Sequence, residues 1–91
     1  MGDGGIASLR RCSALLSRRV GDEVLVRTRD RDVVRLIGTG PALWDALERP
    51  STITDIAVIL ARQFGADPAV VKADIEPVID ALLDAGILCR D

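Results

Sequence analysis

Hydrophobic and polar residues alternate along the first half of the chain with the two-residue period of β-strands. The alternation predicts three short strands, over residues 14–20, 23–29 and 33–37, separated by polar turn signals. In the second strand, Val24 and Val26 fall on one face, and the opposite face carries arginines. Short polar connections between consecutive strands are typical of a meander, so we expect a three-stranded antiparallel sheet.

The second half changes to the three-to-four-residue apolar spacing of helices. Gly38, Thr39 and Gly40 form a turn after the third strand, with Thr39 placed to cap a first helix over residues 41–48. This helix carries Trp44, the only tryptophan of the chain, on its apolar face. The chain therefore changes from sheet to helix at this turn.

Two longer helices follow. The second begins after Thr52, whose hydroxyl is suited to cap it, and ends at Gly65. The third begins after Asp67 and ends before Gly86, and Pro77 inside it is expected to bend it. Strands followed by helices, without internal repeats, predict a single α+β domain.

We assign this domain to residues 13–91. The glycine-rich residues 1–12 show no period and are expected to form a flexible N-terminal tail. The short connection between the second and third helices also suits a helix-turn-helix.

Charge is divided unevenly between the two halves. Residues 1–40 hold eight arginines against five acids, or +3, and residues 41–91 hold four basic residues against nine acids, or −5. Because phosphate contacts dominate nucleic-acid affinity, an acidic helical half disfavours binding of DNA or RNA.

Candidate catalytic groups are scarce. The chain has no histidine, which removes the commonest general base and metal ligand, and its serines lack an activating partner motif. Cys12 and Cys89 stand 77 positions apart without a CxxC pair, so we expect two reduced thiols rather than a metal or redox site. We therefore expect no enzymatic activity, no metal and no cofactor.

The distribution of apolar residues also indicates in which part of the cell the protein is found. No apolar run reaches the roughly 18 residues of a membrane span, and the apolar stretch after Arg11 is too short for a signal peptide. We expect a cytoplasmic protein that does not contact a membrane.

Two features point to peptide binding. The third strand has no sheet neighbour on its far side in this chain, and an open edge accepts an extended peptide by strand addition. In the third helix, Ile79 and Leu83 widen an apolar stripe that is otherwise a normal core face. The extra width indicates either deeper burial or the floor of a groove beside the sheet edge.

Several segments, in this order and spacing, resemble the PqqD family, also called recognition elements of ribosomally synthesised, post-translationally modified peptides. The resemblance covers about residues 14–88. The segments are Thr39-Gly40 followed by the helix with Trp44, Pro50-Ser51-Thr52-Ile53-Thr54-Asp55-Ile56, Phe64-Gly65-Ala66-Asp67 and Leu82-Leu83-Asp84-Ala85-Gly86-Ile87-Leu88.

The resemblance implies a winged helix-turn-helix with a three-stranded antiparallel sheet followed by three helices, and no catalysis. It implies that the leader segment of a precursor peptide adds to the third strand against the third helix. The leader would then be presented to a maturation enzyme such as a radical-SAM protein or a leader protease. The residues expected to bind the peptide are Val33, Val34, Arg35, Leu36, Val71, Lys72, Ile75, Ile79 and Leu83.

Two other functions stay open at this stage. A winged-helix transcription regulator would bind duplex DNA with strong salt dependence. A small adaptor would dock onto a larger enzyme without a peptide ligand. The open edge also permits a homodimer through the third strands.

Overall fold

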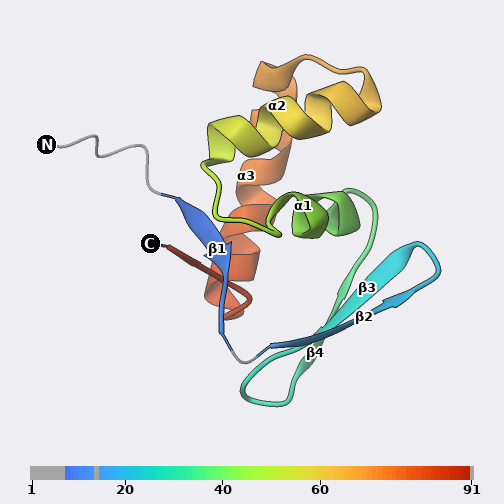
Figure 1. The fold of residues 1–91 in the computed structure, drawn as a ribbon, viewed down its shortest axis with the longest axis vertical. Coiled ribbons are helices and arrows are strands. Elements are labelled where there is room, and N and C mark those ends of the chain that lie inside the picture. Colours follow the sequence, from blue (N-terminus) through green and yellow to red (C-terminus); the bar gives the residue numbers. More distant parts are fainter. Residues whose placement is uncertain (1–7, 14, 91) are drawn as a thin grey trace, which may run out of the picture.

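The computed structural model describes residues 8–13 and 15–90, and all structural statements below refer to these residues. A three-stranded sheet is followed by three helices, and a short strand lies at each end of the described chain (Figure 1). The elements, in order, are β1 Leu9–Arg11, β2 Leu16–Val20, β3 Glu23–Arg27, β4 Val33–Leu36, α1 Gly40–Ala46, α2 Ile53–Phe64, α3 Pro68–Asp84 and β5 Leu88–Arg90.

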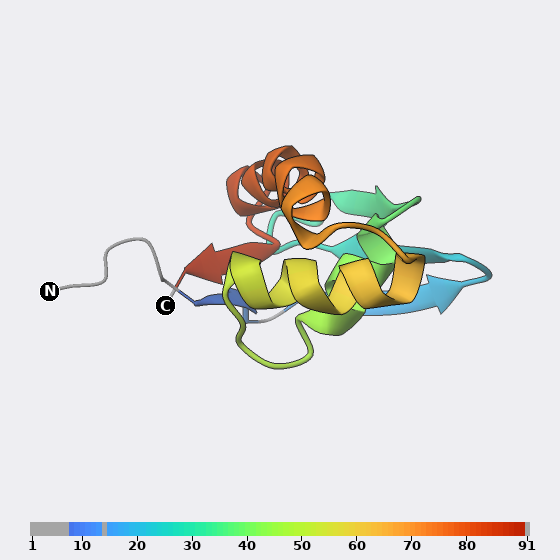
Figure 2. The ribbon, with the colours of Figure 1, turned by 90° about the horizontal axis from the view of Figure 1, so that it is seen from above.

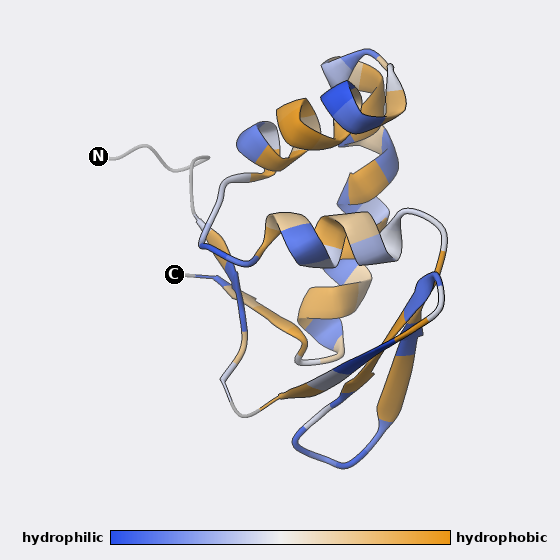
Figure 3. Cartoon of the chain, turned by 45° about the vertical axis from the view of Figure 1, so that its right-hand side comes forward, coloured by the Kyte–Doolittle hydropathy of each residue, from blue (hydrophilic) through white to orange (hydrophobic). Residues whose placement is uncertain are grey.

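The predicted sheet is confirmed. Its strands are antiparallel in the order β2-β3-β4, and the register places Val24 opposite Leu36 and Val26 opposite Val34. The alternation works as expected, because Val24, Val26 and Leu36 are buried while their chain neighbours face the other side. Figure 3 shows hydrophobic and hydrophilic segments following one another along this sheet.

Strand β3 ends at Arg27, two residues earlier than predicted. The chain closes a loop there, because the Thr28 N–H donates to the Asp32 carbonyl and the Arg31 N–H donates to the Thr28 carbonyl, both at 2.9 Å. Thr28, the first residue of this loop, is buried. The alternating pattern of residues 23–29 gave no sign of these bonds, since polar residues at a strand end and in a loop look alike.

The helices begin and end close to the predicted residues. The Asp55 N–H donates to the Thr52 hydroxyl at 3.1 Å, and the Ala69 N–H donates to the Asp67 carboxylate at 2.8 Å, so both predicted caps form. Gly65 ends α2 in the left-handed conformation, with φ of 64°. The cap expected of Thr39 does not form, because its side chain makes no bond to the helix.

Helix α1 begins at Gly40 for a steric reason. A Cβ atom at this position would lie 3.1 Å from the Leu36 Cβ, closer than side chains normally approach. Glycine therefore lets the helix start against the end of β4, and Gly38 supplies the preceding turn with φ of 61°.

A second, two-stranded sheet was not predicted. β1 pairs antiparallel with β5, with Leu9 opposite Arg90, and Leu9 is buried (Figure 2). Leu9 also exchanges two backbone hydrogen bonds with Ser51, at 2.8 and 3.0 Å. The expectation of a loose tail is therefore wrong for Leu9–Arg11, and residues 1–7 lie outside the described residues. A three-residue strand is too short to show a period.

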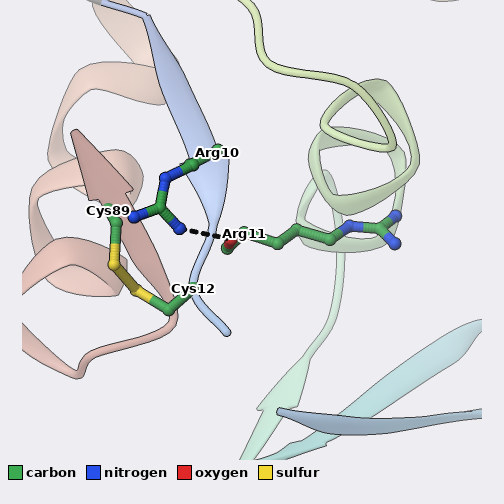
Figure 4. The surroundings of a disulfide bond; sticks show 4 residues. All are labelled: Arg10, Arg11, Cys12 and Cys89. Atoms are coloured by element: carbon green, nitrogen blue, oxygen red, sulfur yellow. Dashed lines mark hydrogen bonds between the residues drawn. A yellow bond between two sulfur atoms is a disulfide. The ribbon is translucent and has the colours of Figure 1, made fainter. Parts of the chain in front are cut away.

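This pairing corrects the expectation of two reduced thiols. Cys12 follows β1 and Cys89 lies in β5, and the two form a disulfide with their Cα atoms 5.2 Å apart (Figure 4). Sequence spacing suggested no contact, because 77 positions separate the two residues. The antiparallel pairing of the two end strands brings these two cysteines next to each other in space.

The core is one cluster to which both sheets and all three helices contribute. Its largest fully buried side chains come from α1, the residue after it, α2, α3, β3 and the β5 region; they are Leu43, Leu47, Ile56, Leu60, Ile75, Ile87, Leu88 and Val26. Trp44 belongs to this cluster and is covered by Arg11, whose guanidinium lies 4.1 Å from the ring centre and donates to the Trp44 carbonyl at 2.6 Å. Figure 4 shows Arg11 extending from β1 toward α1.

Among the described residues, none of the helices has the length and apolar content that a bilayer span requires.

Trp44→Ala should lower the free energy of unfolding by roughly 3–5 kcal/mol, because Trp44 is only 6% exposed and its removal leaves a large cavity. The matched control is Phe64→Ala. Phe64 is 54% exposed, so this variant should stay within about 1 kcal/mol of the wild type. Urea denaturation measures both, and equal losses would contradict the burial of Trp44.

Reduction of the disulfide should lower the free energy of unfolding by roughly 2–4 kcal/mol, since the bond closes a loop that spans nearly the whole domain. Urea denaturation of oxidised and reduced protein measures the difference. The double variant Cys12→Ser, Cys89→Ser is the control and should match the reduced wild type. A variant as stable as the oxidised protein would disprove the bond's contribution.

Candidate functional site

The outer edge of β4 is the first part of the candidate site. β4 is the last strand in the order β2-β3-β4, and no described residue pairs with its far side. Such an edge presents a row of backbone donors and acceptors for another strand. Figure 2 shows β4 and α3 on the same side of the molecule.

The alternation of β4 gives its two faces different roles. Val34 is half-buried and Leu36 is buried, so both side chains face the core. Val33 and Arg35 face the opposite side, and Val33 is 61% exposed. A peptide strand paired with β4 would direct alternate side chains to these same two faces.

Arg35 is held on the outer face of the sheet by Glu23. Its Nε and a terminal nitrogen donate to the two Glu23 carboxylate oxygens at 2.6 and 2.9 Å. The hydrogen bond to Glu23, and then its negative charge, raise the pKa of the Arg35 guanidinium. Glu23 therefore holds the Arg35 side chain on the outer face and balances its charge. Arg35 can contribute to the binding of a peptide at the β4 edge through its backbone.

Helix α3 supplies the second part of the site. Val71, Ile75 and Ile79 are buried in the core, whereas Lys72 and Leu83 are half-buried. At about 100° per residue, Lys72, Ile79 and Leu83 follow one margin of the buried stripe. Leu83 packs against the core and keeps part of its surface accessible.

The two explanations for the wide stripe of α3 can now be separated by residue. Ile79 is only 3% exposed, so this residue widens the apolar stripe because it is buried in the core and not because it lines a groove. Leu83 is the apolar residue of the margin that a ligand can reach.

The nine residues predicted to bind a peptide therefore fall into two groups. Five keep accessible side-chain surface: Val33, Val34, Arg35, Lys72 and Leu83. Four are buried and form the wall behind them: Leu36, Val71, Ile75 and Ile79. Contact of any of the nine with a peptide stays a prediction.

One residue of this region was not among the predicted site residues. Ile37 directly follows β4 and is 57% exposed, so its apolar side chain is accessible at the end of this strand. The alternation of residues 33–37 placed it on the outer face with Val33, which was the available signal.

The exposed side of α3 is acidic. Lys72 is the only basic residue of the helix, and the acids Asp74, Glu76, Asp80 and Asp84 are all exposed. Across residues 8–13 and 15–90, no three potential ligands among His, Cys, Asp and Glu gather as a metal site would require.

Comparisons with known proteins show which family and which solved structures this chain is similar to. Residues 23–88 match the family model described as coenzyme PQQ synthesis protein D (PqqD). A search of curated proteins finds no match.

Two solved structures share the fold. One is the solution NMR structure of the PqqD truncation of Methylobacterium extorquens PqqCD, a functional, stand-alone recognition element for ribosomally synthesised and post-translationally modified peptides. It is 25% identical, with 91% of this chain and 89% of that chain covered and a TM-score of 0.77. The other is TbiB1 in complex with the TbiA(β) leader peptide, at 21% identity, 87% and 93% coverage and a TM-score of 0.78.

The family model spans most of the chain, from the start of β3 to the start of β5, and so includes the β4 edge and the whole of α3. The chain belongs to the PqqD family.

Proposed function

We propose that this protein captures the leader segment of a ribosomally synthesised precursor peptide and presents it to a modifying enzyme. The leader adds to β4 as a fourth strand and lies against the Lys72–Leu83 margin of α3. The observation that carries the proposal is the unpaired edge of β4 in a chain of the PqqD family. The relatives support it, since one is a recognition element and another is in complex with a leader peptide.

Affinity in this arrangement comes from main-chain hydrogen bonds, which any extended peptide can make. Specificity comes from the alternate side chains of the leader that point toward α3. There they meet the accessible part of Leu83 and the flexible stem and ammonium of Lys72. An apolar residue near an acidic residue in the leader is the pattern that these two side chains favour.

The protein in this proposal has no catalytic role and needs no cofactor, and it acts in the cytoplasm beside the enzyme it serves. The enzyme is a radical-SAM maturase or a leader protease. The Methylobacterium extorquens relative supports a separable recognition module, because it is a functional part of the longer PqqCD.

Leu83→Asp should weaken leader binding by at least about tenfold, because a carboxylate replaces the accessible apolar surface of the groove. Ala81→Asp is the matched control: it adds the same charge to α3 at an exposed position roughly 160° away around the helix. The measurement is a titration with the leader of the short peptide encoded nearest the gene. Circular dichroism should show both variants folded, and equal affinities would contradict a groove at Leu83.

Backbone NMR of the same titration should show its largest shift changes at residues 33–36 and along residues 72–83. The wild type should bind this leader with a Kd in the micromolar range or below, and with weak salt dependence, since hydrogen bonds and apolar contacts dominate. Duplex DNA should cause no gel shift, because the exposed face of α3 is acidic. Salt-sensitive DNA binding would favour the transcription-regulator alternative.

A further inference from the structure

The outer face of the three-stranded sheet is covered by neither helices nor the second sheet. Its cross-strand rows follow from the register: Leu16, Arg27 and Val33 lie opposite one another, and Arg18, Leu25 and Arg35 form the next row. Leu16 is 63% exposed and Leu25 is half-buried. Val20 and Ile37 continue this exposed apolar surface at the other end of the sheet.

Part of this face is hollowed. A shallow depression of about 440 Å³ lies here. Its walls come from β2, β3 and β4, and they are Leu16, Ser17, Arg18, Leu25, Arg27 and Val33. The floor is apolar and two arginines border it.

The charge of this face is positive. Arg35 is neutralised by Glu23, but Arg18 and Arg27 form no ion pair within the described part of the chain. Arg19, the neighbour of Arg18, points to the opposite face and bonds Asp45 of α1 at 2.7 Å. Arg18 and Arg27 therefore leave positive charge on the outer face, where a docking partner would meet it.

The size of the face indicates a transient contact. Strands rise about 3.3 Å per residue and lie about 4.8 Å apart, so three strands of this length cover about 17 Å by 14 Å, or roughly 240 Å². A stable dimer buries about 800 Å² on each partner. The face by itself is therefore too small for a stable dimer and fits a transient contact.

We propose that the outer face of this sheet docks onto the modifying enzyme, at a patch with an apolar centre and acidic residues around it. The inference rests on the proposed function and adds the surface by which the enzyme is recruited. Docking on the face leaves the β4 edge open, so the leader and the enzyme bind at the same time. Leu16 and Leu25 supply the apolar contact, and Arg18 and Arg27 select the acidic border by charge.

The test uses Leu16→Asp and Arg18→Glu, both on β2, the strand farthest from the β4 edge. The control is Val58→Asp, which adds a charge at an exposed apolar position of α2. The partner probe is the purified radical-SAM protein or leader protease encoded beside the gene. Binding of this enzyme is measured both with and without leader, and leader affinity is measured separately.

Both β2 variants should bind the enzyme at least about tenfold more weakly than wild type and slow precursor modification, while their leader affinity stays within about twofold. Added salt should weaken wild-type docking more than that of Arg18→Glu. Unchanged enzyme binding in both β2 variants, or a loss equal to that of Val58→Asp, would overturn the proposal.

Sedimentation of the wild type alone tests whether a second copy of the chain occupies this face instead of the enzyme. A dimer that Leu16→Asp dissociates would assign the face to a second copy and overturn the proposal. Failure of the wild type to bind any leader would count against the proposed function instead, because enzyme docking is read from a different surface and a different titration.

Discussion

The structure depends on burial of a single small hydrophobic core between the inner face of the three-stranded sheet and the three helices. Only two aromatic residues are present, so the core is built mainly from aliphatic side chains of moderate size. All three helices and strands β1, β3, β4 and β5 contribute to it, and none can bury its apolar face alone. Because the helices cover one face of the sheet, they leave the β4 edge and the outer face available to other molecules.

The second sheet closes this core at its other end. β1 and β5 bring Leu9 and Leu88 into the core, and the Cys12–Cys89 disulfide joins the two strands. Arg11 then links β1 to α1 through the Trp44 ring and carbonyl. The end strands therefore support the helices, and they do so without contributing a strand to the sheet that carries the candidate site. The candidate site and the disulfide-linked end strands therefore lie in separate parts of the molecule.

Long periodic segments made much of the fold predictable. The faces of β3 and β4, the caps at Thr52 and Asp67 and the stop at Gly65 all follow from local rules that need no tertiary information. Prediction failed where a tertiary contact decides the outcome: the three-residue end strands, the disulfide across the domain and the early end of β3. The candidate site was predictable as an edge and a helix. The spacing marked Ile79 and Leu83 together as the residues that widen the helical stripe, and only packing showed that Ile79 is buried while Leu83 stays accessible.

The amino-acid sequence by itself determined the order of strands and helices, the face that each turns inward and the absence of histidine chemistry, because these depend on residue types and their spacing. Only the tertiary structure decided that the two chain ends pair, which side chains of the wide helical stripe stay accessible, and that Arg35 is tied to Glu23 while Arg18 and Arg27 are not. These outcomes depend on how separate elements approach one another in space. That approach is set by the packing of the whole core rather than by any one segment.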